Sequence, residues 1–268
     1  MKVATLQLSY QGLSSTKLYN YIRIAHKQGV KLLLLGEYVL CPFFKELQNL
    51  SLEMIDELAK LQTKVLKESA KNYNIYIVAP MVIVKKKKPY KVIVKFSPKS
   101  TSYYYQQILI NYPHWDEESF FANEPAQLKA PLCFNIDGLK CAVIAGFELH
   151  FDPIWEKIDE KNIDLVLVAS VATFNSFERW KMLLASRAFT HNCFVLRANR
   201  IGEYKDSEES WEFYGDSLLC SPDGEIVEHL GNQEELMIAH ANHKEVLSAK
   251  KTWHFKEILK KRARSLGE

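Results

Sequence analysis

An acidic residue follows directly on one apolar run that has the length of a buried strand. Glu37 comes one residue after the run Leu32–Leu35, with Gly36 between them. Sites in α/β folds form at the carboxyl ends of strands, where a carboxyl group is partly removed from water. Burial of this kind raises its pKa and suits it to act as a general base. Glu37 is therefore a candidate base, and the alternative interpretation is a solvated glutamate at the end of a strand.

Motifs of several other enzyme classes do not occur in the sequence. It contains no GxGxxG, no GxxxxGK[ST] and no GxSxG, so it lacks the usual nucleotide signatures and the nucleophile elbow. His240 and His243 are three residues apart, but the first ends a predicted strand, so we predict no metal site and no cofactor.

Five widely spaced cysteines form neither a CxxC pair nor a Cys/His pattern with zinc-finger spacing. We expect free, mostly buried thiols in a reducing compartment. Cys41 is the only cysteine near Glu37 along the chain, and the other four fall inside strand-like runs. Cys141 lies five residues before Gly146 in one run, so it should face the opposite side of its strand.

Composition indicates an ordinary globular protein. The chain has 268 residues, 47% of them hydrophobic, and a formal net charge of +3. These values exclude a disordered chain and argue against a nucleic-acid partner. No apolar run approaches the ~20 residues that span a bilayer, and the N-terminus shows no signal-peptide pattern. We therefore expect a cytoplasmic protein that binds neither membranes nor nucleic acid. The basic run Lys85–Lys88 is interpreted as a solvated hairpin turn.

Hydrophobic periodicity predicts strands and helices that alternate along a single domain of residues 1–268. The predicted strands are Val3–Leu8, Lys31–Tyr38, Ile75–Val82, Lys91–Phe96, Ser102–Ile108, Leu132–Ile136, Lys140–Phe147, Asp164–Ser170, Cys193–Asn199, Asp216–Cys220, Glu225–Glu228 and Leu236–Ala241. The predicted helices are Ser15–Gln28, Ser51–Asn72, Asp152–Glu160, Phe177–His191 and a C-terminal tail of about residues 244–264. This mixture predicts an α/β protein whose helices cover its sheets.

The segment from Lys140 to Pro153 resembles the nucleophile region of carbon-nitrogen hydrolases of the nitrilase superfamily. In that family an apolar strand is followed by a nucleophilic Cys, an aromatic residue, an acid and then Phe. This chain matches at Phe147, Glu148 and Phe151, but Gly146 occupies the nucleophile position. The resemblance continues in order over about residues 1–253. Its further matching segments are Ile163–Ser170, Trp180, Arg187-Ala188, Asn199–Gly202, Phe213–Ser217 and Pro222–Gly224.

The resemblance implies a chemistry of four groups. A Cys attacks an amide or nitrile carbon, a Glu transfers the proton, a Lys stabilises the oxyanion, and a second Glu orients the substrate and the Lys. It assigns the base to Glu37. It assigns the lysine position to Gln107, or to Gln106 one residue earlier, and the second glutamate to Glu117, or to Glu118 one residue later. The sequence thus predicts that the two glutamates are kept and that the Cys and Lys are lost.

The family also implies a fold and an assembly. We expect a four-layer α-β-β-α sandwich that forms a homodimer or a higher homo-oligomer. The candidate interface is made by the helix that contains Trp180 and the helix that begins at Asp152.

Two hypotheses of function follow. The first is a catalytically degenerate hydrolase that binds a small amide, amine or carboxylate, with Phe147, Glu148 and Glu118 as ligand contacts, or that serves as a non-catalytic partner protein. The alternative is an active amidohydrolase in which Glu37 activates a water in the space left at Gly146. Specificity is expected in three loops, which are Cys41–Asn49, Tyr112–Gln127 and Tyr204–Glu212.

Overall fold

The computed structural model describes the backbone of residues 1–265 and the side chains of residues 1–262. Within that part of the chain, two six-stranded sheets carry most of the strands. The first sheet has the order β16-β1-β2-β3-β4-β5. Its strands are β1 (Lys2–Gln7), β2 (Leu32–Leu35), β3 (Tyr76–Lys85), β4 (Lys88–Phe96), β5 (Thr101–Tyr105) and β16 (Glu235–His240).

The second sheet has the order β15-β14-β11-β10-β9-β8. Its strands are β8 (Leu132–Ile136), β9 (Leu139–Ala145), β10 (Leu165–Ala169), β11 (Phe194–Ala198), β14 (Leu218–Cys220) and β15 (Ile226–His229). Two short hairpins complete the strands, and they are β6 (Asn111–Tyr112) with β7 (Trp115–Asp116) and β12 (Ile201–Lys205) with β13 (Ser210–Tyr214).

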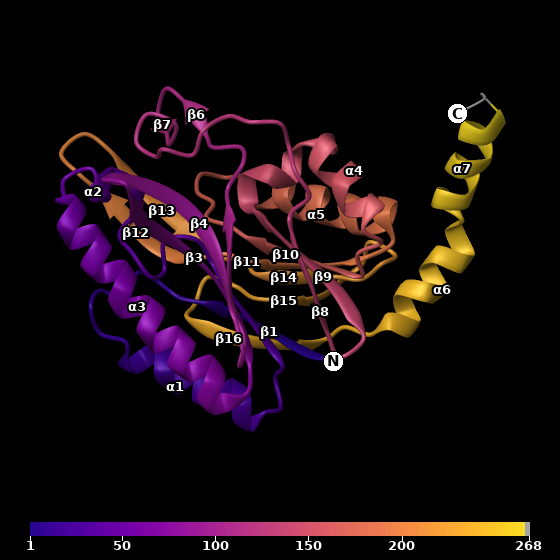
Figure 1. Ribbon diagram of the computed structural model, residues 1–268, viewed down its shortest axis with the longest axis horizontal. Helices are drawn as coiled ribbons and strands as arrows, with labels where there is room; N and C mark the ends of the chain where they lie inside the picture. Colours follow the sequence, from indigo (N-terminus) through magenta and orange to yellow (C-terminus); the bar gives the residue numbers. More distant parts are fainter. Residues whose placement is uncertain (266–268) are drawn as a thin grey trace.

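The two sheets pack face to face between two layers of helices, as the predicted α-β-β-α sandwich requires (Figure 1). Helices α1 (Thr16–Lys27) and α3 (Leu52–Tyr73) cover the first sheet, and α4 (Asp152–Glu160) and α5 (Phe177–His191) cover the second. The remaining helical segments are α2 (Phe44–Leu47), the 3-10 turn η1 (Gly146–His150), α6 (His243–Trp253) and α7 (Phe255–Ser265).

Burial on both faces explains why the central strands are apolar without alternation. In β2, Leu32 and Leu34 enter the core between the sheets, whereas Leu33 and Leu35 pack under the helices. Strand β9 is divided in the same way, and Cys141 faces the core between the sheets, as predicted. Strand β8 lies at the edge of its sheet, and the face that carries Cys133 and Asn135 is exposed. For this reason Cys133 is exposed, and the prediction that it is buried is wrong.

The structure has tight turns between two pairs of neighbouring strands, one of them at the predicted Lys85–Lys88 hairpin. The hairpin between β3 and β4 turns at Lys86 and Lys87, which both have positive φ, as a tight hairpin turn requires. Strands β14 and β15 pair antiparallel across the Ser221–Gly224 turn.

The C-terminal tail, predicted as one helix, is two helices because His254 adopts φ 53° between α6 and α7. None of the described helices has both the length and the apolar character needed to cross a bilayer.

Candidate active site

A buried lysine lies between two buried glutamates at one end of the sandwich. Lys91 Nζ is 2.7 Å from Glu37 Oε2 and 2.7 Å from Glu117 Oε1. All three side chains are almost completely removed from solvent. Tyr38 closes the group from one side, because its hydroxyl donates to Glu117 Oε1 at 2.6 Å and its ring centroid lies 5.0 Å from Lys91 Nζ. Glu37 and Glu117 were both predicted as site residues, and the structure brings them together on one cation.

Backbone contacts hold each of the three residues in place. Glu37 follows β2, and its N–H donates to the carbonyl of Ser170 at 3.0 Å, which joins the ends of the two sheets. The side chain of Asn123 makes two hydrogen bonds to the backbone of Lys91. Its Oδ1 accepts from the Lys91 N–H at 2.9 Å, and its Nδ2 donates to the Lys91 carbonyl at 2.8 Å. The Glu117 N–H donates to the Ile110 carbonyl at 2.8 Å. The site is thus fixed by hydrogen bonds of the main chain as well as by its ion pairs.

Burial and the neighbouring charges shift the pKa values of Glu37 and Lys91 in opposite directions. Burial raises the pKa of Glu37, and the neighbouring Lys91 ammonium opposes that rise only in part. Burial alone would lower the pKa of Lys91, but the charges of Glu117 and Glu37 outweigh it and raise the pKa. Lys91 is therefore an ammonium group at neutral pH. An ammonium placed between two carboxylates offsets the cost of burying them.

The amine between the two glutamates does not come from the predicted lysine position. Gln107 contacts neither glutamate, because its Nε2 donates to the Tyr104 hydroxyl at 2.9 Å and to the Lys129 carbonyl at 3.0 Å. Gln106 turns its Nε2 to the Ile108 carbonyl at 2.8 Å. The amine comes instead from the neighbouring strand β4, where the Lys91 carbonyl accepts the N–H of Gln106 at 3.2 Å. Adjacent strands lie only ~4.8 Å apart, so a long lysine side chain can supply a site from the next strand.

The sequence does carry a signal for Lys91. It opens the apolar run Lys91–Phe96, where a lysine at the end of a buried strand needs an ionic partner. The resemblance points to Gln107 or Gln106 in the following strand, so it does not identify Lys91 as a site residue. Asn123, which brackets Lys91, was also not singled out, because its role depends on contacts that are distant in sequence.

Gly146 lies where the nucleophile was expected, but no vacancy exists there. Its N–H donates to Glu37 Oε1 at 3.2 Å. A Cβ added at Gly146 would lie 2.6 Å from Ser170 Cβ and 3.0 Å from Ser170 Cα. Real Cβ atoms do not approach other atoms so closely, so this backbone accepts no side chain unless Ser170 moves. Ser170 fills the space that a cysteine side chain would need.

The hydroxyl of Ser170 is itself directed toward strand β11. Ser170 Oγ accepts from Arg197 Nε at 2.9 Å, and it lies 3.2 Å from both the Ala198 carbonyl and Asn199 Oδ1. Neither acceptor is a base that could remove the hydroxyl proton. Ser170 therefore occupies the nucleophile's space without offering an activated nucleophile.

Cys41 does not replace the missing thiol. It is buried in the aromatic cluster that also contains Tyr38. Burial raises the pKa of the Cys41 thiol to about 12, with only partial opposition from Arg200 and Lys91. The thiol is therefore protonated at neutral pH and is a poor nucleophile.

The predicted ligand contacts have different environments. Glu148 is buried, and it accepts from the Tyr104 hydroxyl at 2.9 Å, the Gln107 N–H at 2.7 Å and the Ala145 N–H at 2.9 Å. Burial raises its pKa to about 7. Glu148 thereby ties the end of β5 to the end of β9, and its oxygens face protein groups rather than a cavity.

Glu117 and Glu118 differ in burial and in their contacts. Glu118 is exposed and accepts from Asn111 Nδ2 at 2.6 Å, whereas Glu117 contacts Lys91.

Phe147, the residue after Gly146, lines a pocket of about 390 Å³. Trp115 and Val171 also line it, and they adjoin the Glu117 and Ser170 regions of the chain. The lining of this pocket does not include Glu37, Lys91 or Glu117.

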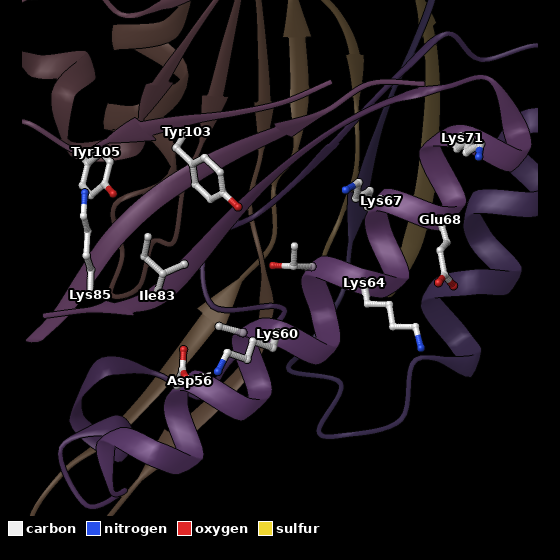
Figure 2. Close-up of a pocket in the computed structure, with 12 residues that line it drawn as sticks. Asp56, Lys60, Lys64, Lys67, Glu68, Lys71, Ile83, Lys85, Tyr103 and Tyr105 are labelled. Carbon is white, nitrogen blue, oxygen red and sulfur yellow. Dashed lines mark ion pairs between the residues drawn. The ribbon is translucent and has the colours of Figure 1, made fainter. Parts of the chain in front are cut away.

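A larger groove of about 760 Å³ lies elsewhere, between α3 and the outer face of the first sheet. Figure 2 shows the lysines of α3 spaced along the helix, with Tyr103 and Tyr105 of β5 across from them. None of the predicted site residues lines this groove. A further pocket of about 540 Å³ is lined by Tyr104, Gln106 and Gln107. We assign the candidate ligand site to the pocket of about 390 Å³, because Phe147, the residue after Gly146, lines it.

Comparisons with known proteins agree with the fold. The model of the carbon-nitrogen hydrolase family matches residues 2–251, and the chain therefore belongs to this family. It is 24% identical over 194 residues to the 2-oxoglutaramate amidase of Bacillus subtilis (strain 168), which covers 72% of each chain. It is 25% identical over 240 residues to a nitrilase of Pyrococcus abyssi (strain GE5 / Orsay), covering 88% of this chain and 87% of the relative.

Solved structures share the same fold at low sequence identity. A carbon-nitrogen hydrolase from Helicobacter pylori G27 superimposes with a TM-score of 0.81 at 17% identity, covering 96% of this chain and 94% of that one. An amidase from Nesterenkonia sp. gives a TM-score of 0.76 at 17% identity, with 95% of each chain covered. The four-layer architecture expected from the sequence is thus that of solved carbon-nitrogen hydrolases.

Proposed function

We propose that this chain is a catalytically degenerate carbon-nitrogen hydrolase that binds a small amide, amine or carboxylate without cleaving a C–N bond. One observation carries the proposal: Gly146 occupies the nucleophile position, and Ser170 Cβ fills the space that a side chain there would need. Removal of the attacking residue from a nucleophile-dependent hydrolase costs on the order of 10⁶ in turnover. Glu37, Lys91 and Glu117 cannot replace a group that forms the covalent intermediate.

The pocket beside Gly146 supports the ligand-binding part of the proposal. Its volume of about 390 Å³ falls within the range of small-molecule sites, roughly 300–1,000 Å³. It adjoins the buried cluster through Phe147 and Val171, the residues that follow Gly146 and Ser170. A family member that loses its nucleophile but keeps a formed pocket retains the means to bind a ligand.

The alternative, in which Glu37 activates a water, has weaker support. Both carboxylate oxygens of Glu37 are engaged, Oε1 by the Gly146 N–H and Oε2 by Lys91 Nζ. A general base must lie within hydrogen-bond reach of its water, and the space beside Gly146 is already taken by Ser170.

The test follows candidate ligands by NMR during incubation with the pure protein. Saturation-transfer difference spectra report binding, and the same spectra over hours report conversion. We expect at least one small amide, N-carbamoyl amine or carboxylate to bind with no product formed. A Glu37→Gln variant is the control, because product that forms with wild type and disappears with this variant would establish hydrolysis and overturn the proposal.

We infer a reducing, cytoplasmic location for the protein. Its five cysteines are free thiols, four of them buried and one exposed. Proteins of oxidising compartments more often pair such residues.

A further inference from the structure

Six aromatic side chains that line the pocket beside Gly146 form a continuous series of ring contacts, which we call the collar. Neighbouring ring centroids along the collar are 5.2–5.8 Å apart. In the order of their contacts, the six are Phe174, His114, Tyr112, Phe147, His150 and Trp180. The collar begins and ends in one short segment, because Phe174 and Trp180 are six residues apart in the sequence.

Most of the collar is exposed in the single chain, although aromatic rings are usually buried. Tyr112 is 47% exposed and Phe174 is 52% exposed. Phe174 also has φ 58°, a left-handed conformation that a bulky residue rarely adopts. The fold thus holds a strained, exposed ring at the edge of a pocket. A ligand that stacks against the collar would cover this surface.

The charged residues around the pocket indicate which charge its ligand carries. Arg179, on the first turn of α5, lines the pocket and has no ion-pair partner among the described residues. The described lining residues include no Asp or Glu. An aromatic cage alone would also suit an organic cation, but an unopposed guanidinium repels one and attracts a carboxylate.

We propose that this pocket binds an aryl carboxylate, a flat aromatic ring that carries a carboxylate group. The ring stacks within the collar, and the carboxylate lies toward Arg179. This inference rests on the proposed function, since it names the chemical class of the ligand for the same pocket. Offset-stacked and edge-to-face ring pairs contribute about 0.5–1.5 kcal/mol each, so removal of one collar ring should weaken binding about 2- to 10-fold.

Calorimetry with three probes separates the two parts of the proposal. Benzoate has both the ring and the charge, benzamide has the ring without the charge, and cyclohexanecarboxylate has the charge without the aromatic ring. We expect benzoate to bind most tightly to the full-length protein. Equal affinity for cyclohexanecarboxylate would overturn the role of the collar. Equal affinity for benzamide would overturn the role of Arg179, and failure of benzoate to bind at millimolar concentration would overturn the proposal.

Matched variants locate the site. Tyr112→Ala should weaken benzoate binding about 2- to 10-fold. Arg179→Gln should weaken the binding of benzoate but not that of benzamide. The controls are Tyr103→Ala, which removes an exposed tyrosine on β5, and Arg23→Gln, which removes an exposed arginine on α1. Both controls should bind benzoate as wild type does, and an equal loss in a control and its partner variant would contradict the assignment.

The same probes distinguish this inference from the proposed function. Release of ammonia from benzamide would overturn catalytic degeneracy and leave the aryl pocket in place. Absence of benzoate binding with no hydrolysis of any amide would overturn the aryl pocket and leave degeneracy in place.

Discussion

Lys91 links two carboxylates that would otherwise be buried without compensation. Its Nζ lies 2.7 Å from an oxygen of Glu37 and 2.7 Å from an oxygen of Glu117. A buried ion pair adds little net stability compared with apolar residues, but removal of one partner leaves an uncompensated charge. The cluster therefore makes the fold dependent on Lys91 even where no chemistry takes place.

Substitution of Lys91 by Met should lower the free energy of unfolding by about 3–5 kcal/mol at pH 8. The loss should be smaller at pH 5 than at pH 8, because a lower pH favours the neutral form of Glu37, whose pKa burial already raises. Urea unfolding at the two pH values measures both effects. The matched control is Lys95→Met, since Lys95 lies on the same strand, is mostly buried and has no ion-pair partner among the described residues. Equal losses in the two variants would contradict the account.

Substitution of Gly146 by Ala tests the occupied nucleophile space directly. The added Cβ would meet Ser170 Cβ at 2.6 Å, and overpacking of this kind costs about 1–3 kcal/mol. Gly231→Ala is the control, because a Cβ there meets nothing within 4 Å. Chemical denaturation should show a loss for Gly146→Ala alone. A Gly146→Ala protein as stable as wild type would mean that the space beside Ser170 is open.

At the scale of elements, prediction from the sequence succeeded where burial alone determines structure. The core strands were predicted because both faces are buried, which gives continuous apolar runs such as Leu32–Leu35. The short hairpins β6–β7 and β12–β13 were missed, since two to five residues within a loop carry little periodicity. The break between α6 and α7 was missed as well, because His254 rather than Gly or Pro makes it.

The site was predictable only where it depends on local sequence. Glu37 could be found because it directly follows a buried strand. Lys91 could not be assigned with the same rule, since its partners are brought to it by the pairing of β4 within the sheet and by the loop that contains Glu117. The role of Ser170 depends on the parallel pairing of β9 with β10, which places it against Gly146.

Glu148 connects the ends of β5 and β9 and makes the stability of this junction depend on pH. Its folded pKa of about 7 lies above the ordinary value of 4.5. A carboxyl group with a raised pKa contributes stability that is complete below pH 4.5 and is lost as the pH rises through about 7. The loss corresponds to about 3 kcal/mol.

Urea unfolding between pH 5 and pH 8 should show this loss in wild type. The slope should be reduced in Glu148→Gln, which cannot titrate, and kept in Glu118→Gln, which removes an exposed carboxyl group. A slope that is the same in all three proteins would show that Glu148 does not titrate in this range.

At the scale of the whole molecule, we expect two sandwiches to pair through the layer of α4 and α5. Large apolar side chains on this layer are exposed, with Phe177 at 41% and Met182 at 66%. Light scattering coupled to size exclusion should therefore give the mass of a dimer. Met182→Glu should shift the population toward the monomer. Met54→Glu changes a methionine on α3 that is 55% exposed, and it should leave the dimer intact. A monomeric wild type would contradict the expectation.

The central claim is that the fold and the Glu37–Lys91–Glu117 cluster persist while the nucleophile is lost. Ammonia release from amides, N-carbamoyl amines and nitriles tests it most directly, with wild type compared with the double variant Gly146→Cys/Ser170→Gly. The variant restores a thiol and removes the Ser170 Cβ that blocks it. We predict no release by wild type above background and measurable release by the double variant. Release by wild type that a Glu37→Gln substitution abolishes would contradict the claim.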